Sequence, residues 1–385
     1  MKSGSRFVKT LFQDQFKELK KADVPIYKVP KSIQQCIDVV RIAEDGIFEI
    51  PGGKYTKTYR FKDINYVTNP EEEQVSIFEL YCKLLNSLDI PFKITINNRN
   101  KNMKTFRKKI LYAHRKDGYD TYRDCFNQEI ERRIMEGKQG IKQEKLLTVV
   151  IQRKNYEEAK VFFHTLENNI NIQFMELGSS ITSLNANERL RILHNFYRMG
   201  EEETFDIDVN EYIKRYEDWK NDVCCSSIKF NAYDFETDRK KCRVMFIRKY
   251  PSALSDQFLC ELANLPVNCM ISIDVIPIPK DSANKLLDKK YMGIEMDIGK
   301  QQRVRNKNND FSSDISYSKR AEKKEIESIM NDVRENDQMI FYVGVSLLFI
   351  ADDMEELERN CSSATTVIKK HCCEVDTYYL QQREA

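Results

Sequence analysis

The chain has 385 residues and a mass of 45.5 kDa, which is enough for two or three domains of ordinary size. Hydrophobic residues make up 41% of it and only 12 Gly and 9 Pro are present, so the composition argues against a disordered, collagen-like, all-β barrel or disulfide-dense protein. Because 62 Lys and Arg oppose 60 Asp and Glu, any attraction to nucleic acid or to a membrane must come from local patches.

The first predicted elements are a basic arm and an antiparallel meander. Residues 1–31 carry eight basic and three acidic residues and show little apolar periodicity. Apolar patterns predict strands over 36–42, 47–50 and 55–61, and these are separated by the turn sequences Glu44-Asp45-Gly46 and Pro51-Gly52-Gly53-Lys54. Short turns join antiparallel neighbours, so the three strands are expected to form a meander.

A helix is predicted directly after the meander. Asn69 and Pro70, with the acidic residues that follow them, are typical of a helix N-terminus. A strand is predicted over 92–96, and the stretch 93–142 is predicted to be mostly long helix. Four apolar residues recur at helical spacing in the first helix and are predicted to face the core: Val75, Phe78, Cys82 and Leu85.

A β-α-β unit is expected next. The apolar run over 144–152 predicts a buried strand, and Asn155 with Glu158 resembles the capping box of a following helix. A strand over 172–177 completes this predicted unit. A second capping-box pattern, Asn185 with Glu188, predicts the start of another helix.

The second half of the chain also alternates strand and helix. Two amphipathic helices with a polar break at 306–316 predict a helical hairpin. The last helix is predicted to face inward with Leu357, Cys361, Ala364 and Ile368. The other elements expected here are strands over 242–250, 268–277, 337–350 and 373–379, and helices over 255–265 and 352–370.

Together these elements predict an α+β fold, built from an antiparallel meander and β-α-β units of ferredoxin-like type, with a protruding helical hairpin. The predicted domains are a basic N-terminal arm (1–31), an N-terminal α+β domain (32–200), an acidic connector (201–240), and a second α+β domain (241–385) that contains the hairpin (281–335).

One glycine-rich sequence resembles part of a phosphate-binding loop. A true loop of that kind needs Gly-x-x-x-x-Gly-Lys-Ser/Thr between a strand and a helix. Here Tyr55 follows Lys54, the leading glycine is missing, and strands are predicted on both sides. A hairpin turn is therefore the better interpretation of Gly52-Gly53-Lys54.

Two acidic patterns could suggest a metal site. Asp206, Asp208 and Asn210 match the first positions of a calcium loop, but Glu211 stands where the sharp turn requires glycine. An acidic helix start is the better interpretation of this segment. The second pattern loosely resembles the carboxylates and lysine of a metal-dependent nuclease, although a charged turn has the same spacing: Asp234, Glu236, Asp238 and Lys240.

Histidine and cysteine provide no clear catalytic or metal site. The chain has four histidines on separate segments, and its 11 cysteines include no Cys-x-x-Cys pair. His371 beside Cys372 and Cys373 is the nearest approach to a metal-binding group, and a half-buried histidine is the simpler interpretation. The sequence therefore predicts no catalytic residue, no resident cofactor and no metal.

The stretch 93–142 is the most basic region and is the candidate contact surface. It holds 14 basic and 6 acidic residues, with tyrosines interleaved among them. Such a segment can follow phosphates and stack bases, or it can contact anionic lipid headgroups or an acidic partner. A solvated helix with inward-facing aromatic residues is the simpler alternative. The candidate contact residues are Arg107, Lys108, Lys109, Arg115, Arg132 and Arg133.

Several strings, taken in their order along the chain, resemble a known family. They are Asp45-Gly46-Ile47-Phe48-Glu49-Ile50-Pro51-Gly52-Gly53-Lys54-Tyr55, Tyr59-Arg60-Phe61-Lys62-Asp63-Ile64-Asn65-Tyr66, Glu144-Lys145-Leu146-Leu147-Thr148, Leu184-Asn185 with Glu188-Arg189-Leu190-Arg191-Ile192-Leu193-His194, Lys249-Tyr250-Pro251-Ser252-Ala253-Leu254-Ser255-Asp256, and Tyr379-Leu380-Gln381-Gln382. Over roughly residues 30–385 the chain thus resembles the N-terminal half of the large conjugation ATPase of type IV secretion systems (the TraC/TraE kind, within the VirB family) of Gram-positive conjugative elements.

This resemblance implies a role without catalysis. In that family a motor domain with Walker motifs follows this region, and no Walker motif occurs in this chain, so ATP would belong to the missing C-terminal motor. The resemblance implies an assembly domain that links the motor to inner-membrane channel proteins of a conjugation apparatus and that associates with further copies of itself. No small-molecule substrate is expected.

The expected location is the cytoplasm, peripheral to the inner face of the cell membrane. The longest apolar run, over 339–351, is about 13 residues long, and a bilayer-spanning helix needs roughly 20. The alternative function is a module that handles single-stranded DNA through the stretch 93–142, and a metal nuclease at Asp234 is a third class.

Overall fold

The computed structural model describes residues 32–385 except 65, 67, 101–110, 136–140, 200, 202–203, 216–217, 239, 252, 308–315 and 384, and it describes only the backbone of 100, 133–135, 141–142 and 213–215. The chain divides into two compact units, Met1–Ile37 and Asp38–Ala385. In the described part of the first unit, residues Ile33–Cys36 form a 3-10 helix. The predicted arm 1–31 lies outside the described residues.

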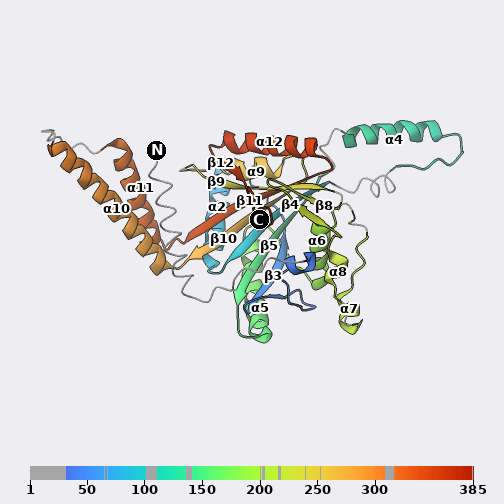
Figure 1. Cartoon of the computed structure of the whole chain (residues 1–385), viewed down its shortest axis with the longest axis horizontal. Helices are drawn as coiled ribbons and strands as arrows, with labels where there is room; N and C mark the ends of the chain where they lie inside the picture. The colour runs from blue at the N-terminus through green and yellow to red at the C-terminus, as the bar shows by residue number, and fades with distance from the viewer. Residues whose placement is uncertain are drawn as a thin grey trace. The chain divides into compact units, whose positions relative to one another are not determined.

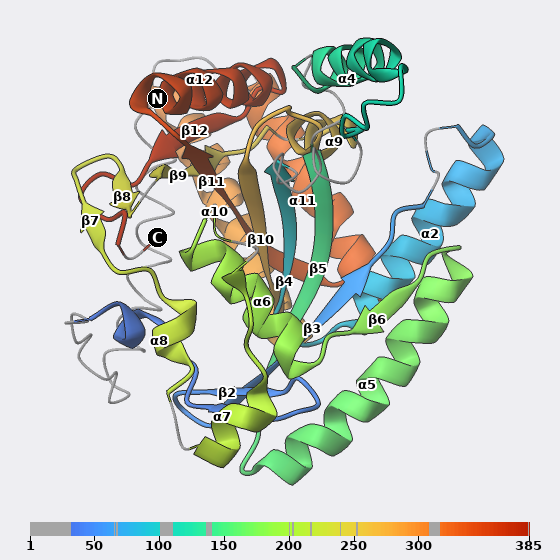
Figure 2. The same ribbon diagram turned by 90° about the vertical axis from the view of Figure 1, so that its right-hand side faces the viewer.

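The second unit is built on one antiparallel sheet (Figures 1 and 2). In the described residues the sheet has twelve strands in the order β1-β2-β3-β5-β4-β10-β11-β9-β8-β7, with β6 paired to β3 and β12 to β9. The strands are β1 (Arg41–Ile42), β2 (Phe48–Ile50), β3 (Lys54–Phe61), β4 (Phe92–Asn100), β5 (Ile141–Gln152), β6 (Ile181–Ser183), β7 (Ile228–Phe230), β8 (Phe235–Thr237), β9 (Lys241–Lys249), β10 (Cys269–Ile278), β11 (Ile340–Ala351) and β12 (Glu374–Thr377).

Helices connect these strands and cover the sheet. The described α-helices are α2 (Glu71–Ser87), α4 (Asp120–Met135), α5 (Tyr156–Glu176), α6 (Ala186–Tyr197), α7 (Val209–Arg215), α8 (Lys220–Val223), α9 (Gln257–Ala263), α10 (Lys280–Lys307), α11 (Tyr317–Arg334) and α12 (Met354–Lys370). The mixed α+β class predicted from the sequence is thus confirmed.

The sheet contains the same strand arrangement twice. In the first module, β3-α2-β4-β5-α5-β6, the spatial order is β6-β3-β5-β4, and in the second module, β9-α9-β10-β11-α12-β12, it is β12-β9-β11-β10. Numbered within each module, both orders are 4-1-3-2. A β-α-β-β-α-β chain with this antiparallel order is the ferredoxin-like arrangement.

The two modules join through their second strands. β4 and β10 pair antiparallel over seven residue pairs, from Phe92↔Val275 to Asn98↔Cys269. The predicted α+β domains 32–200 and 241–385 therefore contribute to one continuous sheet. The predicted acidic connector 201–240 contains α7, α8, β7 and β8, and β8 pairs with β9 of the second module.

One face of the sheet holds a hydrophobic core shared by both modules. This core includes Leu84 from α2, Phe163 from α5, Leu262 from α9 and Leu357 from α12, packed on alternating strand residues such as Ile271. The four helices therefore cover the same face. On the other face α6 lies over the first module, and Figure 2 shows α6 on the side of the strands opposite α2 and α5.

The predicted hairpin is confirmed. α10 and α11 lie side by side and extend away from the sheet between β10 and β11 (Figure 1). The two helices bury Leu287 and Ile294 of α10 and Ile326 and Val333 of α11. Apolar residues at a spacing of three or four thus placed this pair correctly.

Four local predictions were wrong. Residues 36–42 form a strand only at Arg41–Ile42, and the predicted strand over 172–177 is occupied by the last turn of α5 and the residue after it. β6 completes that module instead. The stretch 93–142 is not one long helix, because β4 extends to Asn100 and helix is described only over Asp120–Met135. In α2, Val75 and Phe78 are 53% and 51% exposed rather than buried.

Candidate functional site

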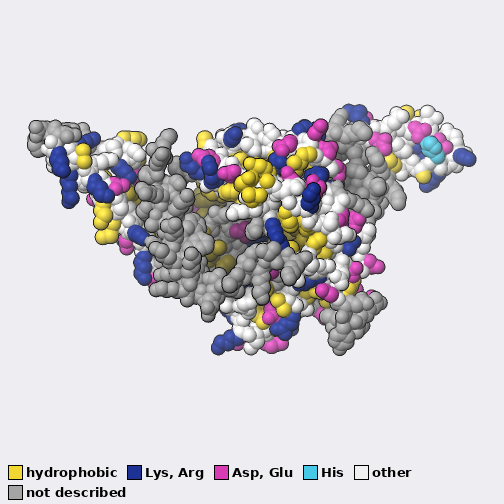
Figure 3. Space-filling view, viewed as in Figure 1, with side chains coloured by type: hydrophobic (Ala, Val, Ile, Leu, Met, Phe, Trp, Pro, Cys, Tyr) yellow, Lys and Arg dark blue, Asp and Glu magenta, His cyan; other side chains and the backbone are white. Residues whose placement is uncertain are grey.

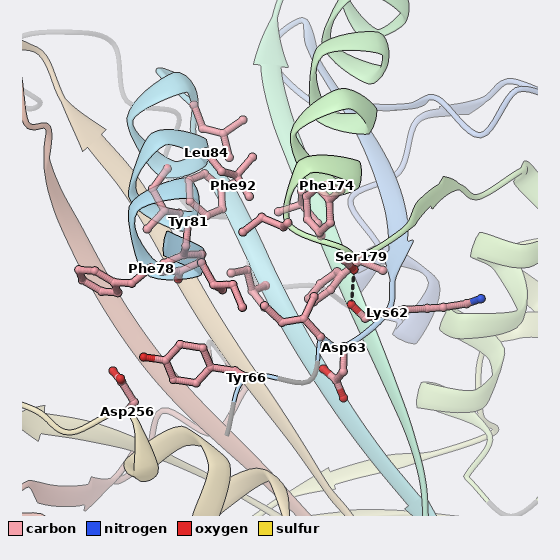
Figure 4. Close-up of a pocket in the computed structure, with 18 residues that line it drawn as sticks. Lys62, Asp63, Tyr66, Phe78, Tyr81, Leu84, Phe92, Phe174, Ser179 and Asp256 are labelled. Carbon is pink, nitrogen blue, oxygen red and sulfur yellow. Dashed lines mark hydrogen bonds between the residues drawn. The ribbon is translucent and has the colours of Figure 1, made fainter. Parts of the chain in front are cut away.

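An apolar cavity lies beside α2 and is the candidate functional site. Its volume is about 320 Å³, and it is lined by α2, the end of β3 with the segment after it, strands β4 and β5, the end of α5, and Asp256 before α9 (Figure 4). We call this cavity the α2 groove. It lies on the face of the sheet that α2, α5, α9 and α12 cover, and its walls come mainly from the first module.

The sequence of α2 explains why this groove is apolar. The helix carries two neighbouring apolar stripes, and the stripe with Ile77 and Leu84 packs into the shared core. The other stripe presents Phe78 and Tyr81 to the groove, and their side chains remain 51% and 44% exposed. Exposed apolar side chains that line a cavity are typical of an interaction site.

The wall opposite α2 is fixed by aromatic packing and hydrogen bonds. The rings of Phe61 and Phe174 lie 5.8 Å apart between their centroids. The hydroxyl of Ser179 donates to the carbonyl oxygen of Lys62 at 2.5 Å, and the amide of Lys62 donates to the carbonyl oxygen of Ser180 at 3.0 Å. The chain that leaves β3 is therefore attached to the chain that leaves α5, so this wall is formed without a ligand.

Polar groups occupy the rim of the groove. Desolvation raises the pKa of Tyr81 above its usual value, and Cys82 and Asp256 raise it further, so the phenol stays protonated at neutral pH. Asp63 forms an ion pair with Lys145. Asp256 is exposed and has no ion-pair or hydrogen-bond partner for its carboxylate among the described residues. Within the described residues, the rim thus offers an unpaired carboxylate beside an apolar surface.

The charge on α2 has the same sign. Over Glu71–Ser87 the helix carries Glu71, Glu72, Glu73 and Glu79 but a single basic residue, Lys83, which lies 3.7 Å from Glu176. An anionic ligand would be repelled from this side of the groove, whereas a positively charged segment would be attracted.

The lining of the groove suits contact with apolar side chains. Among the described residues that line it, none forms a hydrogen-bonded pair of nucleophile and base, and the walls are aliphatic and aromatic. An apolar cavity of this kind can bury one or two large side chains of a partner, and burying one such side chain contributes about 1.5–3 kcal/mol.

The predicted basic contact surface is only partly described. Arg107, Lys108 and Lys109 lie outside the described residues, and of Arg133 only the backbone is described. Arg132 pairs with Glu129 at 2.8 Å, and the backbone amide of Arg115 donates to Asp120. Of the six predicted contact residues, the structure therefore describes the side chains of two, Arg115 and Arg132.

The described part of that stretch is neutral in formal charge and aromatic at its surface. Residues 111–135 contain five basic and five acidic residues. Arg123 forms ion pairs with both Asp117 and Asp120, which hold its guanidinium charged. Three tyrosines are 56%, 64% and 74% exposed: Tyr112, Tyr119 and Tyr122. The predicted inward packing of these aromatic residues is therefore wrong.

The acidic patterns have structural partners in the fold. Asp234 accepts a hydrogen bond from Asn231 at 2.7 Å, and the carboxylate of Asp238 accepts from the amides of Ser226 and Ser227, each at 2.7 Å. Glu236 forms an ion pair with Lys241 at 2.6 Å. In the described part of the chain, no group of three or more His, Cys, Asp or Glu residues could hold a metal ion.

The calcium-like segment begins a short helix. The side chain of Asp208 accepts a hydrogen bond from the amide of Asn210 at 3.0 Å, and α7 starts at Val209. The glycine-rich sequence Gly52-Gly53 is the turn between β2 and β3, with both glycines at positive φ. Both segments thus have the local structure that their simpler interpretations predict.

Strings that carry the family resemblance converge around α6. The guanidinium of the half-buried Arg189 donates to the carbonyl oxygens of Gly46 and Thr56 at 2.8 and 2.7 Å and lies 3.8 Å from the centroid of the Phe48 ring. Desolvation lowers the pKa of Arg189 to about 9. Arg60 pairs with Glu144 at 2.7 Å. These residues fix the meander to α6 and β5.

Sequence reasoning missed the α2 groove. Its signal was the apolar face of α2 that carries Phe78, but Phe78 was predicted to face the core. Searches against protein-family models and against curated proteins found no match to this chain. Among the described helices, none is long and apolar enough to cross a bilayer.

Proposed function

We propose that this chain is a non-catalytic assembly domain of a conjugative type IV secretion ATPase, which links the motor to an inner-membrane channel protein during DNA transfer. The observation that carries this proposal is the α2 groove, where exposed aromatic residues border an apolar cavity with an acidic rim. The resemblance of the ordered strings to the conjugation ATPase family supplies the biological setting.

The charge around the groove supports a particular kind of partner. Cytoplasmic segments next to transmembrane helices are rich in Lys and Arg. Such a segment carries apolar anchors beside basic residues, which complement the apolar walls and the free carboxylate of Asp256. This position would hold the domain at the inner face of the cell membrane.

The proposal is tested by changing the groove in a conjugating host. Phe78→Glu puts a charge on the exposed rim without removing a core residue, and we expect it to lower the transfer frequency at least about tenfold, as the loss of a large interface side chain does. Val161→Glu is the control, because Val161 on α5 is 68% exposed and does not line this groove. Chain levels are measured for both variants.

A photo-crosslinking residue at position 78 tests the partner directly. We expect a cross-link to an integral membrane protein of the transfer apparatus, and none at position 161. Equal transfer by Phe78→Glu and the unchanged chain would contradict the proposal, as would ATP hydrolysis above background by the purified chain.

A second candidate function is the handling of single-stranded DNA by the stretch 93–142. Exposed Tyr119 and Tyr122, whose ring centroids lie 6.4 Å apart, support it because bases stack on such rings. Fluorescence anisotropy with labelled single-stranded DNA across a salt series is the test. Steep loss of binding with salt, abolished by combined Arg107→Ala, Lys108→Ala and Lys109→Ala, would favour this function.

A further inference from the structure

Helix α10 of the hairpin separates its charges by face. Three of its four carboxylates, Asp288, Glu295 and Asp297, pair with basic residues of α11. Arg334 lies 2.7 Å from Asp288, and Lys319 lies 3.6 Å from Asp297. Much of the negative charge of α10 is therefore neutralised within the hairpin.

The side of α10 away from α11 has a different composition. Seven exposed residues follow one another at intervals of three or four, so they share one face over about 33 Å of helix. Figure 3 shows Lys and Arg with hydrophobic and acidic side chains on the hairpin, at the left of the view. We call this set the outer stripe: Lys285, Lys289, Met292, Met296, Lys300, Arg303 and Lys307.

The outer stripe combines unpaired cations with exposed apolar side chains. Among the described residues, Lys285, Lys289, Arg303 and Lys307 have no ion-pair partner, and Lys300 is 3.7 Å from Asp297. At the centre of the stripe Met292 and Met296 are 62% and 65% exposed. The carboxylate nearest to the stripe on this face is that of Asp281, four residues before Lys285 in the first turn of α10.

We propose that the outer stripe of α10 binds the surface of an anionic phospholipid bilayer. Clustered Lys and Arg on an exposed helix are attracted to anionic headgroups, and their long side chains can reach those headgroups while neighbouring apolar groups enter the interface. Met292 and Met296 are the groups that enter it. A straight stripe suits a flat surface, and its lack of aromatic rings disfavours base stacking with single-stranded DNA.

This inference deepens the proposed function, because it names the surface that would hold the assembly domain against the membrane, and it rests on that function for its setting. The inference about the outer stripe and the proposed function can fail separately. Vesicle binding by the purified chain depends on the outer stripe, whereas the transfer defect of Phe78→Glu depends on the α2 groove.

The test is co-sedimentation of the full chain with vesicles of phosphatidylglycerol and phosphatidylcholine, compared with vesicles of phosphatidylcholine alone. We expect binding only to the anionic vesicles. Each lysine near an anionic surface contributes about fivefold to partitioning, so combined Lys285→Gln and Lys289→Gln should weaken binding about 30-fold. Combined Lys54→Gln and Lys154→Gln changes the net charge equally on exposed lysines elsewhere and should leave binding unchanged.

Two further measurements test whether a bilayer covers the outer stripe. They are vesicle binding by a methionine variant and binding of the chain to single-stranded DNA. Combined Met292→Gln and Met296→Gln should weaken vesicle binding and increase its sensitivity to salt, because only the screened electrostatic part would remain. Absence of binding to anionic vesicles would overturn the inference and point to an acidic protein as the occupant. Equal loss in the Lys54 and Lys154 control, or binding to single-stranded DNA without vesicle binding, would also overturn it.

Discussion

The first and second modules share a frame but differ in the surfaces they present. Both have the strand order 4-1-3-2, and both insert helical structure between their second and third strands. In the first module that insertion contains α4, and in the second it is the α10–α11 hairpin. The comparison indicates that packing in the shared core determines the strand order, whereas the segments inserted between the second and third strands can differ.

The covering helices differ as well. α2 has 17 residues, and α9, its counterpart in the second module, has seven. The longer helix provides a second apolar stripe, and that stripe forms the α2 groove. The candidate docking surfaces thus arise where the modules differ and not where they agree.

The largest expected effect is in the meander, which belongs to the first module. At Gly46, φ is +80° and an added Cβ would lie 2.0 Å from the backbone carbonyl oxygen of Leu184. Gly46→Ala should therefore lower the free energy of unfolding by about 3 kcal/mol or more. Chemical denaturation followed by circular dichroism measures this loss.

The same experiment tests whether the modules unfold together. We expect a single transition for Gly46→Ala, because the two modules share one core. Gly52→Ala is the matched control, with φ of +86° and nothing within 4 Å of an added Cβ, and it should cost only about 1 kcal/mol. Equal losses in the two variants would contradict the clash at Leu184.

An intermediate effect is expected at the joint between the modules. Asn98 of β4 is fully buried, and its side-chain amide donates to the carbonyl oxygen of Ala263 at the end of α9, at 2.6 Å. Gln143 of β5 donates to the same oxygen at 2.9 Å and to Asn98 at 3.1 Å. Residues of the first module therefore cap a helix of the second.

Asn98→Ala should lower the free energy of unfolding by about 1–3 kcal/mol, because the carbonyl oxygen of buried Ala263 loses a donor and the half-buried amide of Gln143 loses an acceptor. The control is Asn97→Ala. It should leave the joint between the modules intact, since the side chain of Asn97 accepts a hydrogen bond from Arg99 within the same strand. A double-mutant cycle of Asn98→Ala with Gln143→Ala should show coupling, and additive losses would show that the three groups do not act as one network.

The smallest expected effect is a difference in thiol reactivity between buried and exposed cysteines of the unchanged chain, and it involves no change in stability. Desolvation raises the pKa of Cys242 to about 12 and that of Cys269 and Cys361 to about 11, so these thiols carry little thiolate at pH 8. Cys125, Cys260 and Cys372 are exposed. Iodoacetamide followed by mass spectrometry should modify the exposed set first.

Labelling in increasing denaturant would sharpen the comparison. Cys269 and Cys361 report on the second module, and half-buried Cys82 reports on α2 of the first. If one module opens before the other, its cysteines will react at lower denaturant. Rapid modification of Cys361 without denaturant would contradict the burial described for α12.

Local signals in the sequence were sufficient for many elements. The capping box of Asn185 and Glu188 is present with both of its hydrogen bonds, and the stripe of Leu357, Cys361, Ala364 and Ile368 is buried as predicted. These predictions succeed because they depend on hydrogen bonds within one turn of helix, or on a single apolar stripe with polar residues on the other faces.

The rest depends on contacts between distant segments. α2 is apolar on two adjacent faces, and only the packed sheet decides that Leu84 is buried while Phe78 stays exposed at the groove. The pairing of β4 with β10 joins residues more than 170 positions apart, and no local pattern indicates it. A count of net charge favours the stretch 93–142 and does not detect α10, where one face carries most of the cations.

The joint between β4 and β10 has a consequence for how the protein can be divided. If the chain were cut within 201–240, each fragment would expose the backbone N–H and C=O groups of an unpaired edge strand over the seven positions of that pairing. Such a strand is a template for intermolecular β-sheet, so the separated halves should aggregate unless they recombine. Co-expression of both halves should therefore rescue the solubility that neither has when produced by itself.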